Sequence, residues 1–335
     1  MAGDPNALRW DGGPGHYEVY YLSATDRASG VGLWIRYTML APRPETGEPA
    51  TCSLWFLAMD PSRPGRPVAR KATFAASKLS SERRPFRLAI GDAELTDRGM
   101  RGGIEDVAWD LRWEDGGGAY EHVHPLLERA RIAKTVLVLP HADLAVSGTV
   151  QWEGRTLELD GARGGQAHLW GSKHAARWCW AHCNDFEIEE GERRPGDFLD
   201  GVSVFVPRLG REVGPSTPVV SRLGGRELLA TSPLAVARSE SLFTLTSWHM
   251  DAHQAGRRIV VDVDARRDDL VGVTYHDPDG ETAYCYNTET ASMRVQVLER
   301  DGHLWRHTDT LVAPRRAHFE YAQRQPVGGM EVHLG

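Results

Sequence analysis

Hydrophobic and polar residues alternate, one by one, in short runs along most of this chain. In residues 32–40, Leu33, Ile35 and Tyr37 occupy one set of alternate positions, and Trp34 and Arg36 occupy the other. The same period of two recurs in residues 16–24, 51–59, 107–114, 144–162, 201–209, 258–266, 270–289 and 293–305. Because successive side chains of a strand point to opposite faces, this period predicts antiparallel strands, bounded here by Gly, Pro, Asp and Asn.

The segments between these runs predict tight turns and few helices. Residues 277–280 (DPDG) lie between two alternating runs and predict a hairpin turn in which Gly280 takes a positive φ. Residues 68–79 and 124–139 are compatible with short helices. Many short strands without amphipathic helices between them indicate a mainly β protein, built as barrels or sandwiches rather than as a doubly wound α/β fold. The charged, turn-rich residues 189–201 are the best candidate for a domain boundary.

The composition is that of a globular protein and argues against two classes of partner. Of the 335 residues, 41% are hydrophobic and 25% are charged, and the formal net charge is −7. We therefore expect no nucleic-acid partner, which needs a basic face, and no stable membrane insertion, which needs about 18 consecutive apolar residues. Cys52, Cys179, Cys183 and Cys285 are not spaced as a disulfide framework. With no secretory signal in view, we expect reduced thiols and a cytoplasmic location.

Residues 168–186 (HLWGSKHAARWCWAHCNDF) concentrate the side chains with the most chemical capability. If residues 177–186 form a strand, one face carries Trp178, Trp180, His182, Asn184 and Phe186, and the other carries Cys179, Ala181, Cys183 and Asp185. The large aromatic face suits the wall of a cavity for a bulky apolar ligand. Spacing alone favours the other interpretation, in which these tryptophans are core packing. The polar groups among the aromatic ones favour a ligand site, because burying them costs free energy unless they are paired or used.

Metal and nucleophile chemistry are less consistent with this spacing. A zinc site would draw on His168, His174, Cys179, His182 and Cys183. On a strand, the two cysteines point away from His182, so the usual ligand pairs are not formed. The neighbouring His182 and Cys183 also face opposite ways, which disfavours a cysteine nucleophile with a histidine base. We therefore predict no metal site, and the chain contains no Walker loop, Gly-x-Ser-x-Gly elbow or dinucleotide fingerprint.

The same segment resembles a known group of enzymes. His168-x-Trp170-Gly, followed by Trp178-x-Trp180-x-x-Cys183-Asn184-x-Phe186, is similar to the motif of tocopherol cyclases, which resemble the hydroxyneurosporene synthase (carotenoid 1,2-hydratase) and AttH-like families. The similarity extends over roughly residues 10 to 190. It implies two tandem lipocalin-like (calycin) β-domains, at 1–195 with the motif and at 196–335. It also implies, without a metal or organic cofactor, hydration, cyclisation, isomerisation or pericyclic closure of an isoprenoid-like or polyketide-like substrate.

The resemblance and the residue types together give a set of candidate site residues. Protonation of an alkene needs an acid shielded from water, and aromatic faces stabilise the carbocation that forms. A carboxylic acid suits this role better than an imidazolium, which would repel the cation, although strand geometry turns Asp185 away from the tryptophans. In a pericyclic reaction, His182 or Asn184 would polarise a carbonyl group instead. The predicted catalytic residues are Asp185, His182 and His168, and the predicted substrate-binding residues are Trp170, Trp178, Trp180, Asn184, Phe186 and Trp34.

Three functions therefore remain open: an enzyme acting on a lipophilic small molecule, a carrier of such a molecule, and a protein in which the tryptophans pack two domains together. Five further residues are weaker candidates. The Tyr-x-Asp element of the hydratases has a candidate counterpart at Tyr275 and Asp277. His122 and His124 alternate on one strand face and are candidate ligands, but histidines in this pattern are more often core or solvated residues. Arg36 is a candidate pocket cation, with a surface or ion-paired arginine as the default interpretation. The sequence leaves the oligomeric state open.

Overall fold

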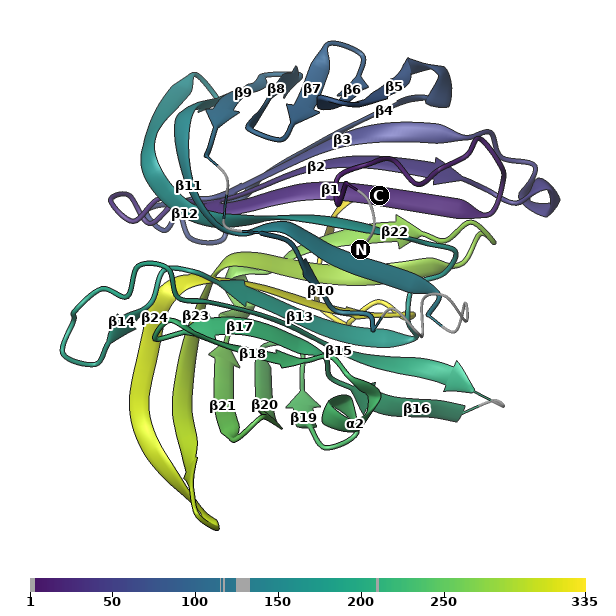
Figure 1. The fold of residues 1–335 in the computed structure, drawn as a ribbon. Helices are drawn as coiled ribbons and strands as arrows, with labels where there is room; N and C mark the ends of the chain where they lie inside the picture. The colour runs from purple at the N-terminus through teal and green to yellow at the C-terminus, as the bar shows by residue number, and fades with distance from the viewer. Residues whose placement is uncertain (1–3, 115, 117, 125–132, 209–210) are drawn as a thin grey trace.

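Nearly all regular structure in this protein is antiparallel β-sheet, as the alternating pattern predicts (Figure 1). The computed structural model describes residues 4–114, 116, 118–124, 133–208 and 211–335. The first sheet consists of β1 (His16–Thr25), β2 (Gly32–Ala41), β3 (Thr51–Met59), β4 (Val68–Ala75), β5 (Leu79–Arg83), β6 (Phe86–Ile90), β7 (Ala93–Thr96), β8 (Gly99–Ile104), β9 (Val107–Arg112), β10 (Tyr120–Glu121), β11 (Thr135–Trp152) and β12 (Arg155–Gly171).

The second sheet lies below the first in the view of Figure 1. It consists of β13 (Arg177–Cys183), β14 (Glu187–Ile188), β15 (Phe198–Arg208), β16 (Arg211–Ser216), β17 (Val219–Leu223), β18 (Arg226–Ala230), β19 (Glu240–Phe243), β20 (Ser247–Gln254), β21 (Arg257–Asp264), β22 (Val271–His276), β23 (Thr282–Asp301), β24 (Leu304–Gln323) and β25 (Val332–Leu334). Helical structure in the described residues is confined to α2 (Pro233–Val236) and short 3₁₀ segments at Pro44–Thr46, Ala76–Lys78 and Arg267–Asp269. No described helix has the length and apolar character to cross a membrane.

The first sheet curls into a nearly closed barrel around its own core. Its strand order is β4-β3-β2-β1-β12-β11-β9-β8-β7-β6-β5. In this order β1 and β12, the first and last strands of the sheet along the chain, are neighbours. Buried residues on the inner face include Ile35, Phe56 and Trp109. The hydroxyl of Tyr37 on β2 donates to carbonyl groups of β7 and β8, each at 3.1 Å, across the barrel. The second sheet, in the order β18-β17-β15-β13-β24-β23-β21-β20-β19, encloses a separate core.

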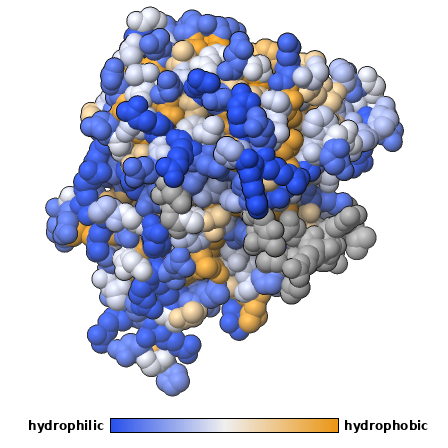
Figure 2. All heavy atoms as spheres, turned by 45° about the horizontal axis from the view of Figure 1, so that its top comes forward, coloured by the Kyte–Doolittle hydropathy of each residue, from blue (hydrophilic) through white to orange (hydrophobic). Residues whose placement is uncertain are grey.

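A third apolar cluster joins the outer faces of the two sheets. On β1, Tyr20 and Leu22 point into the first barrel, whereas Tyr17, Val19 and Tyr21 belong to this interface cluster. On β13, Cys179, Ala181 and Cys183 belong to the core of the second sheet, whereas Trp178 and Trp180 belong to the interface. Strands at the interface are thus buried on both faces, and each face of the predicted alternation has its own apolar partner. On the side shown in Figure 2, hydrophilic residues predominate and hydrophobic ones form separate small groups.

The structure confirms the mainly β fold and corrects one helical expectation. The DPDG turn joins β22 to β23 with Gly280 at φ 87° and its N–H bonded to the carbonyl of Asp277 at 2.9 Å. The helix considered for residues 68–79 is wrong: β4 pairs with β3 over most of this range, and the 3₁₀ segment Ala76–Lys78 follows. Of the alternative at 124–139, residues 125–132 lie outside the described residues, and Thr135 begins strand β11.

The chain passes from one sheet to the other between Gly171 and Arg177. The domain division at 195/196 stays a prediction, but sheet membership changes before it. The segment 168–186 is therefore divided, with its first residues on β12 of the first sheet and its last on β13 of the second.

Candidate functional site

His168 and Trp170 lie on the barrel side of the first sheet, away from the interface. His168 stacks on Tyr20, its cross-strand partner on β1, at 4.0 Å between ring centroids. Its Nε2 lies 2.8 Å from Oε1 of the buried Glu18, and its Nδ1 lies 2.7 Å from the carbonyl of Pro5. Trp170 is half-buried between His168 and the guanidinium of Arg9. These contacts tie the N-terminal segment to the barrel.

Glu18 makes stability at this end of the barrel depend on pH. Burial raises its pKa, but hydrogen bonds from His16, His168 and backbone N–H groups outweigh burial and lower the pKa from 4.5 to about 2. A carboxyl group whose pKa is lower in the folded than in the unfolded protein stabilises the fold at pH values above the unfolded-state pKa. That stabilisation is lost as the pH falls through the folded-state pKa. The contribution, about 3 kcal/mol at neutral pH, should therefore disappear between about pH 5 and pH 2.

We expect Glu18→Gln to lower the free energy of unfolding by about 3 kcal/mol at pH 7 and to have little effect near pH 2. Urea denaturation at a series of pH values measures the difference between the two proteins. Glu45→Gln, at an exposed carboxyl, serves as the control and should follow the wild type throughout. A difference between Glu18→Gln and the wild type that stays constant down to pH 2 would show that Glu18 does not carry the pH dependence.

Trp178, Trp180 and Trp34 lie in the interface cluster. Trp178 stacks on His174 at 5.4 Å between centroids and donates its indole N–H to Glu320. Trp180 meets Tyr21 edge-on at 5.6 Å. These rings pack the sheets together, as the third of the three functional hypotheses expects.

Phe186, Asn184 and Asp185 follow the end of β13 and occupy three different environments. Phe186 is buried in the core of the second sheet. The Asn184 amide donates to the carbonyl of Gly164 at 2.7 Å and to that of Leu144 at 3.3 Å, which attaches this turn to the first sheet.

Asp185 is buried among arginines rather than beside the tryptophans. Its carboxylate lies 3.0 Å from Arg27, 3.2 Å from Arg316 and 3.7 Å from Arg193. Three guanidinium groups surround this one negative charge. Asp185 is therefore an ion-pair anchor between the two sheets. This charged environment differs from the uncharged aromatic wall that the sequence analysis expected beside the catalytic acid.

Asp200 on β15 is a buried acid that the sequence analysis did not single out, and three side chains of the interface contact its carboxylate. His182 Nδ1 lies 3.0 Å from one carboxylate oxygen, His122 Nε2 lies 2.9 Å from the other, and the Trp180 indole N–H lies 3.1 Å from both. We call Asp200, His122 and His182 the interface triad. All three side chains are at most 2% exposed. Burial raises the pKa of Asp200, but hydrogen bonds and charge from both histidines outweigh burial and hold the pKa below its usual range.

Ring nitrogens of both triad histidines make no hydrogen bond to any described residue. These atoms are His182 Nε2 and both nitrogens of His122, of which Nε2 lies at ion-pair distance from Asp200, at 2.9 Å. A Cβ built on Gly165 of β12 would lie 2.7 Å from His182 Nε2, so the close approach of the first sheet to this imidazole requires glycine. Buried imidazole nitrogens without partners are costly, and they are typical of sites that exchange protons with a ligand.

The register of the second sheet places the triad in a row of cross-strand neighbours. Leu229, Val220, Asp200, His182 and His318 are successive partners on β18, β17, β15, β13 and β24. Directly opposite residues in antiparallel strands share a face, so the whole row points toward the first sheet. The imidazoles of His182 and His318 stack at 5.9 Å between centroids.

One end of this row opens into a surface cavity of about 370 Å³. Val220, the neighbour of Asp200, and Tyr120, two residues before His122, both line it. Its described lining residues are Gly118, Ala119, Tyr120, Glu121, Val220, Glu227, Leu229 and Thr231. The Tyr120 hydroxyl donates to Glu227 at 2.6 Å, and its ring meets Phe198 edge-on at 4.8 Å. The cavity is large enough for a small molecule, and neighbours of the triad line it, whereas the three triad residues themselves do not.

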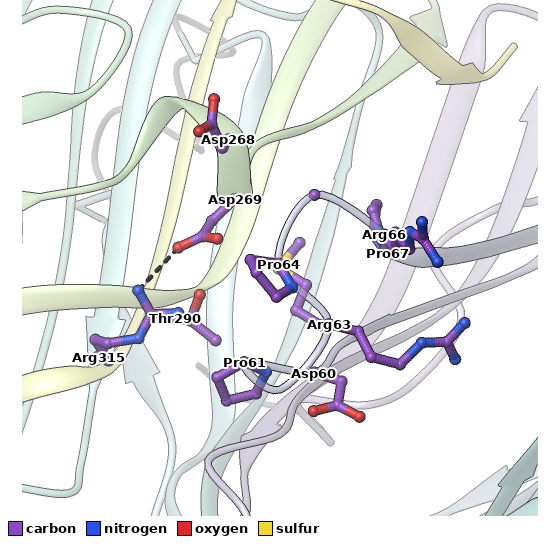
Figure 3. Close-up of a pocket in the computed structure, with 12 residues that line it drawn as sticks. Asp60, Pro61, Arg63, Pro64, Arg66, Pro67, Asp268, Asp269, Thr290 and Arg315 are labelled. Atoms are coloured by element: carbon purple, nitrogen blue, oxygen red, sulfur yellow. Dashed lines mark hydrogen bonds and ion pairs between the residues drawn. The ribbon is translucent and has the colours of Figure 1, made fainter.

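A second cavity, shown in Figure 3, is too small for an organic ligand. The loop from Asp60 to Pro67 borders it on one side, and Asp269, ion-paired to Arg315 at 3.0 Å, borders it on the other. Its volume of about 20 Å³ holds about one water molecule. None of the predicted site residues lines either cavity.

The remaining alternatives from the sequence have definite places in the structure. Tyr275 lies in the interface cluster and donates to Glu320 at 3.3 Å, whereas Asp277 is held by His174 and Arg324, each at 2.7 Å. Burial raises the pKa of the Cys183 thiol to about 12, which is unfavourable for a nucleophile. Among the residues that the structure describes, no group of three or more His, Cys, Asp or Glu is placed to hold a metal ion.

Comparison with known proteins places the chain in a family. It is 30% identical over 305 residues to the Uncharacterized protein Rv0493c of Mycobacterium tuberculosis (strain ATCC 25618 / H37Rv), covering 86% of this chain and 83% of the relative. The Uncharacterized protein MT0513 of strain CDC 1551 / Oshkosh matches with the same values. This chain belongs to the Rv0493c family. No family model matches it.

Solved structures extend this family's fold to AttH-like proteins, as the motif resemblance predicted. A putative AttH from Nitrosomonas europaea matches with a TM-score of 0.54 at 13% identity, covering 93% of both chains. CghA matches with a TM-score of 0.58 at 8% identity, covering 93% of this chain and 89% of CghA. Kievitone hydratase from Nectria haematococca matches with a TM-score of 0.52 at 9% identity, with the same coverage. At these identities the comparisons show that this chain shares the fold of these proteins, and its site must be argued from its own residues.

Proposed function

We propose that this protein is an enzyme that acts on a lipophilic small molecule by proton transfer, in a hydration, cyclisation or isomerisation. The interface triad supplies the acid and the base, in place of Asp185. The observation that carries the proposal is the burial of one carboxylate between two imidazoles whose ring nitrogens are not all hydrogen-bonded by described residues. The chemistry proposed needs no cofactor.

Within the triad, the three side chains have distinct roles. Asp200 receives His122 and His182 on its two oxygens, which fixes both ring orientations and stabilises an imidazolium when one forms. His122 follows the cavity residues Tyr120 and Glu121 directly in the chain, so we assign it the proton transfer to and from the substrate. His182 is the second imidazole that contacts the Asp200 carboxylate, so both histidines interact with the same negative charge.

Two structural neighbours support the class of reaction. Kievitone hydratase is named for a hydration, and CghA has been solved with Sch210972. The cavity walls of this chain combine Val220, Leu229 and the Tyr120 ring with the polar residues Glu121, Glu227 and Thr231, a lining that suits a molecule with both apolar and polar parts. A substrate in this cavity would lie one strand from Asp200.

The proposal is tested by incubating the purified protein with a lipid extract of the source organism in heavy water, followed by untargeted mass spectrometry. We expect a new product that carries deuterium at carbon. His122→Gln should reduce its formation about a hundredfold, because a positioned acid or base contributes about that much or more. His303→Gln, at an exposed histidine, is the matched control and should form product like the wild type.

Other outcomes would contradict the proposal in different ways. Full activity in both His122→Gln and His182→Gln would remove the triad from the reaction. A product without deuterium at carbon would indicate pericyclic closure, in which no acid is needed. Recovery of unchanged compounds from the protein would identify a carrier.

A further inference from the structure

Arg36 is a cation enclosed between the two sheets. It lies on β2, opposite Tyr21 of β1 and Trp55 of β3, on the face that meets the second sheet. Only 4% of its surface is exposed. A buried guanidinium requires either an anion or a set of acceptors to offset its lost hydration.

Aromatic rings surround this guanidinium. Its carbon lies 4.2 Å from the ring centroid of Tyr275, 5.2 Å from that of Trp34 and 6.0 Å from that of Trp55. Ring faces attract a cation and partly replace water. They accept no strong hydrogen bond in the plane of the guanidinium, where its N–H groups point.

The N–H groups of Arg36 have no anionic partner among the described residues. No carboxylate there lies within 4 Å of its guanidinium nitrogens, and its buried Nε makes no hydrogen bond. The carboxylate of Glu320, on the same interface, instead accepts from Trp178 and Tyr275. Arg36 thus differs from the arginines around Asp185, each of which has a carboxylate.

We propose that Arg36 binds the carboxylate group of a lipophilic ligand held between the two sheets. A guanidinium presents a planar fork of donors that matches a carboxylate through two parallel hydrogen bonds. The rings of Trp34, Trp55 and Tyr275 provide the apolar surroundings in which such a pair is strong.

A second cation supports an anion at this position. The Lys71 ammonium lies 4.0 Å from the centroid of the Trp55 ring. Burial and the charge of Arg36 lower the pKa of Lys71 to about 8. Two cations therefore lie against one indole, and no described carboxylate is ion-paired to Arg36. The Lys71 ammonium also donates to the carbonyl of Gly335 at 2.9 Å.

Two aromatic side chains lie between Arg36 and the interface triad. Tyr21, opposite Arg36, meets Trp180, which in turn stacks on His182 at 6.3 Å between centroids. Arg36 and the triad therefore lie on the same interface, separated by two aromatic side chains. That this carboxylate belongs to the substrate rests on the proposed function, whereas carboxylate binding itself requires no turnover.

Isothermal titration calorimetry with dodecanoate and with 1-dodecanol, both below their aggregation limits, tests the assignment. We expect the wild type to bind dodecanoate at least about tenfold more tightly than the alcohol, since charge-assisted hydrogen bonds contribute about that much. Arg36→Met keeps the apolar stem and should abolish the preference, while Arg36→Lys keeps the charge and should retain part of it. Arg83→Met, at an exposed arginine of β5, is the matched control and should behave as the wild type.

Stability separates a ligand-binding role from a structural one. Because Arg36 is buried without an anion, Arg36→Met should unfold at the same urea concentration as the wild type or at a higher one.

Three results would each overturn the assignment of Arg36. These are a preserved carboxylate preference in Arg36→Met, no binding of dodecanoate to the wild type, and a large loss of stability in Arg36→Met. Deuterated product from a wild type without the preference would overturn the role of Arg36 alone. A carboxylate preference in a protein without turnover would support Arg36 and contradict the proposed enzyme.

Discussion

We expect Asp200→Ala to lower the free energy of unfolding at pH 7 by about 3–5 kcal/mol, the usual cost of removing one partner from a buried charged group. The Asp200 side chain is fully buried, and His122, His182 and Trp180 all direct nitrogens at it. Alanine leaves these groups without an acceptor in a region that water does not reach. Urea denaturation measures the loss.

An exposed pair of the same type provides the control for Asp200. His249 Nδ1 lies 2.7 Å from Asp262 Oδ1, but the two side chains are 53% and 46% exposed. Asp262→Ala should therefore cost at most about 1 kcal/mol. Because the pKa of Asp200 is lowered, its contribution should also decline as the pH falls below the usual aspartate value of about 3.9. A cost for Asp200→Ala no larger than that for Asp262→Ala would contradict a desolvated triad.

We also expect Trp180→Ala to cost about 3–5 kcal/mol, as truncation of a buried tryptophan does. The ring is 7% exposed and fills space between Tyr21 of the first sheet and His182 of the second. Removal leaves a cavity in the interface and takes a donor from Asp200. Thermal or urea denaturation measures the change.

Two further substitutions separate packing from hydrogen bonding at this position. Trp180→Phe keeps most of the ring volume and removes the N–H, so it should cost less than Trp180→Ala. Trp305→Ala, at a half-buried tryptophan near the turn between β23 and β24, should cost about 1 kcal/mol or less. If Trp180→Ala leaves stability unchanged but abolishes binding of a small molecule, Trp180 is the wall of a ligand site, as the motif first suggested.

The motif HLWGSKHAARWCWAHCNDF therefore does not form one continuous pocket wall. His168 stabilises the N-terminal segment, Trp178 and Trp180 pack the sheets together, and Asp185 is an ion-pair anchor. His182 is the one predicted catalytic residue that we retain in the proposed acid–base group. Its partners Asp200 and His122 are both outside the motif.

The sequence by itself determined the strands, because the period of two is a local property of the chain. Each strand of the interface could be assigned its two faces from alternation alone, as in β13, where Cys179 and Trp178 turn to opposite sides. The DPDG turn and the AttH-like architecture were also accessible from local residues and from the motif.

Only the tertiary structure decided which of those faces meet. His182 and Asp200 become neighbours through the register of β13 with β15, and His122 joins them from the other sheet across 78 residues of sequence. The arginines around Asp185 likewise come from positions as distant as Arg27 and Arg316. Alternation specifies two faces but not their partners, because register and sheet curvature depend on contacts between residues far apart in the chain.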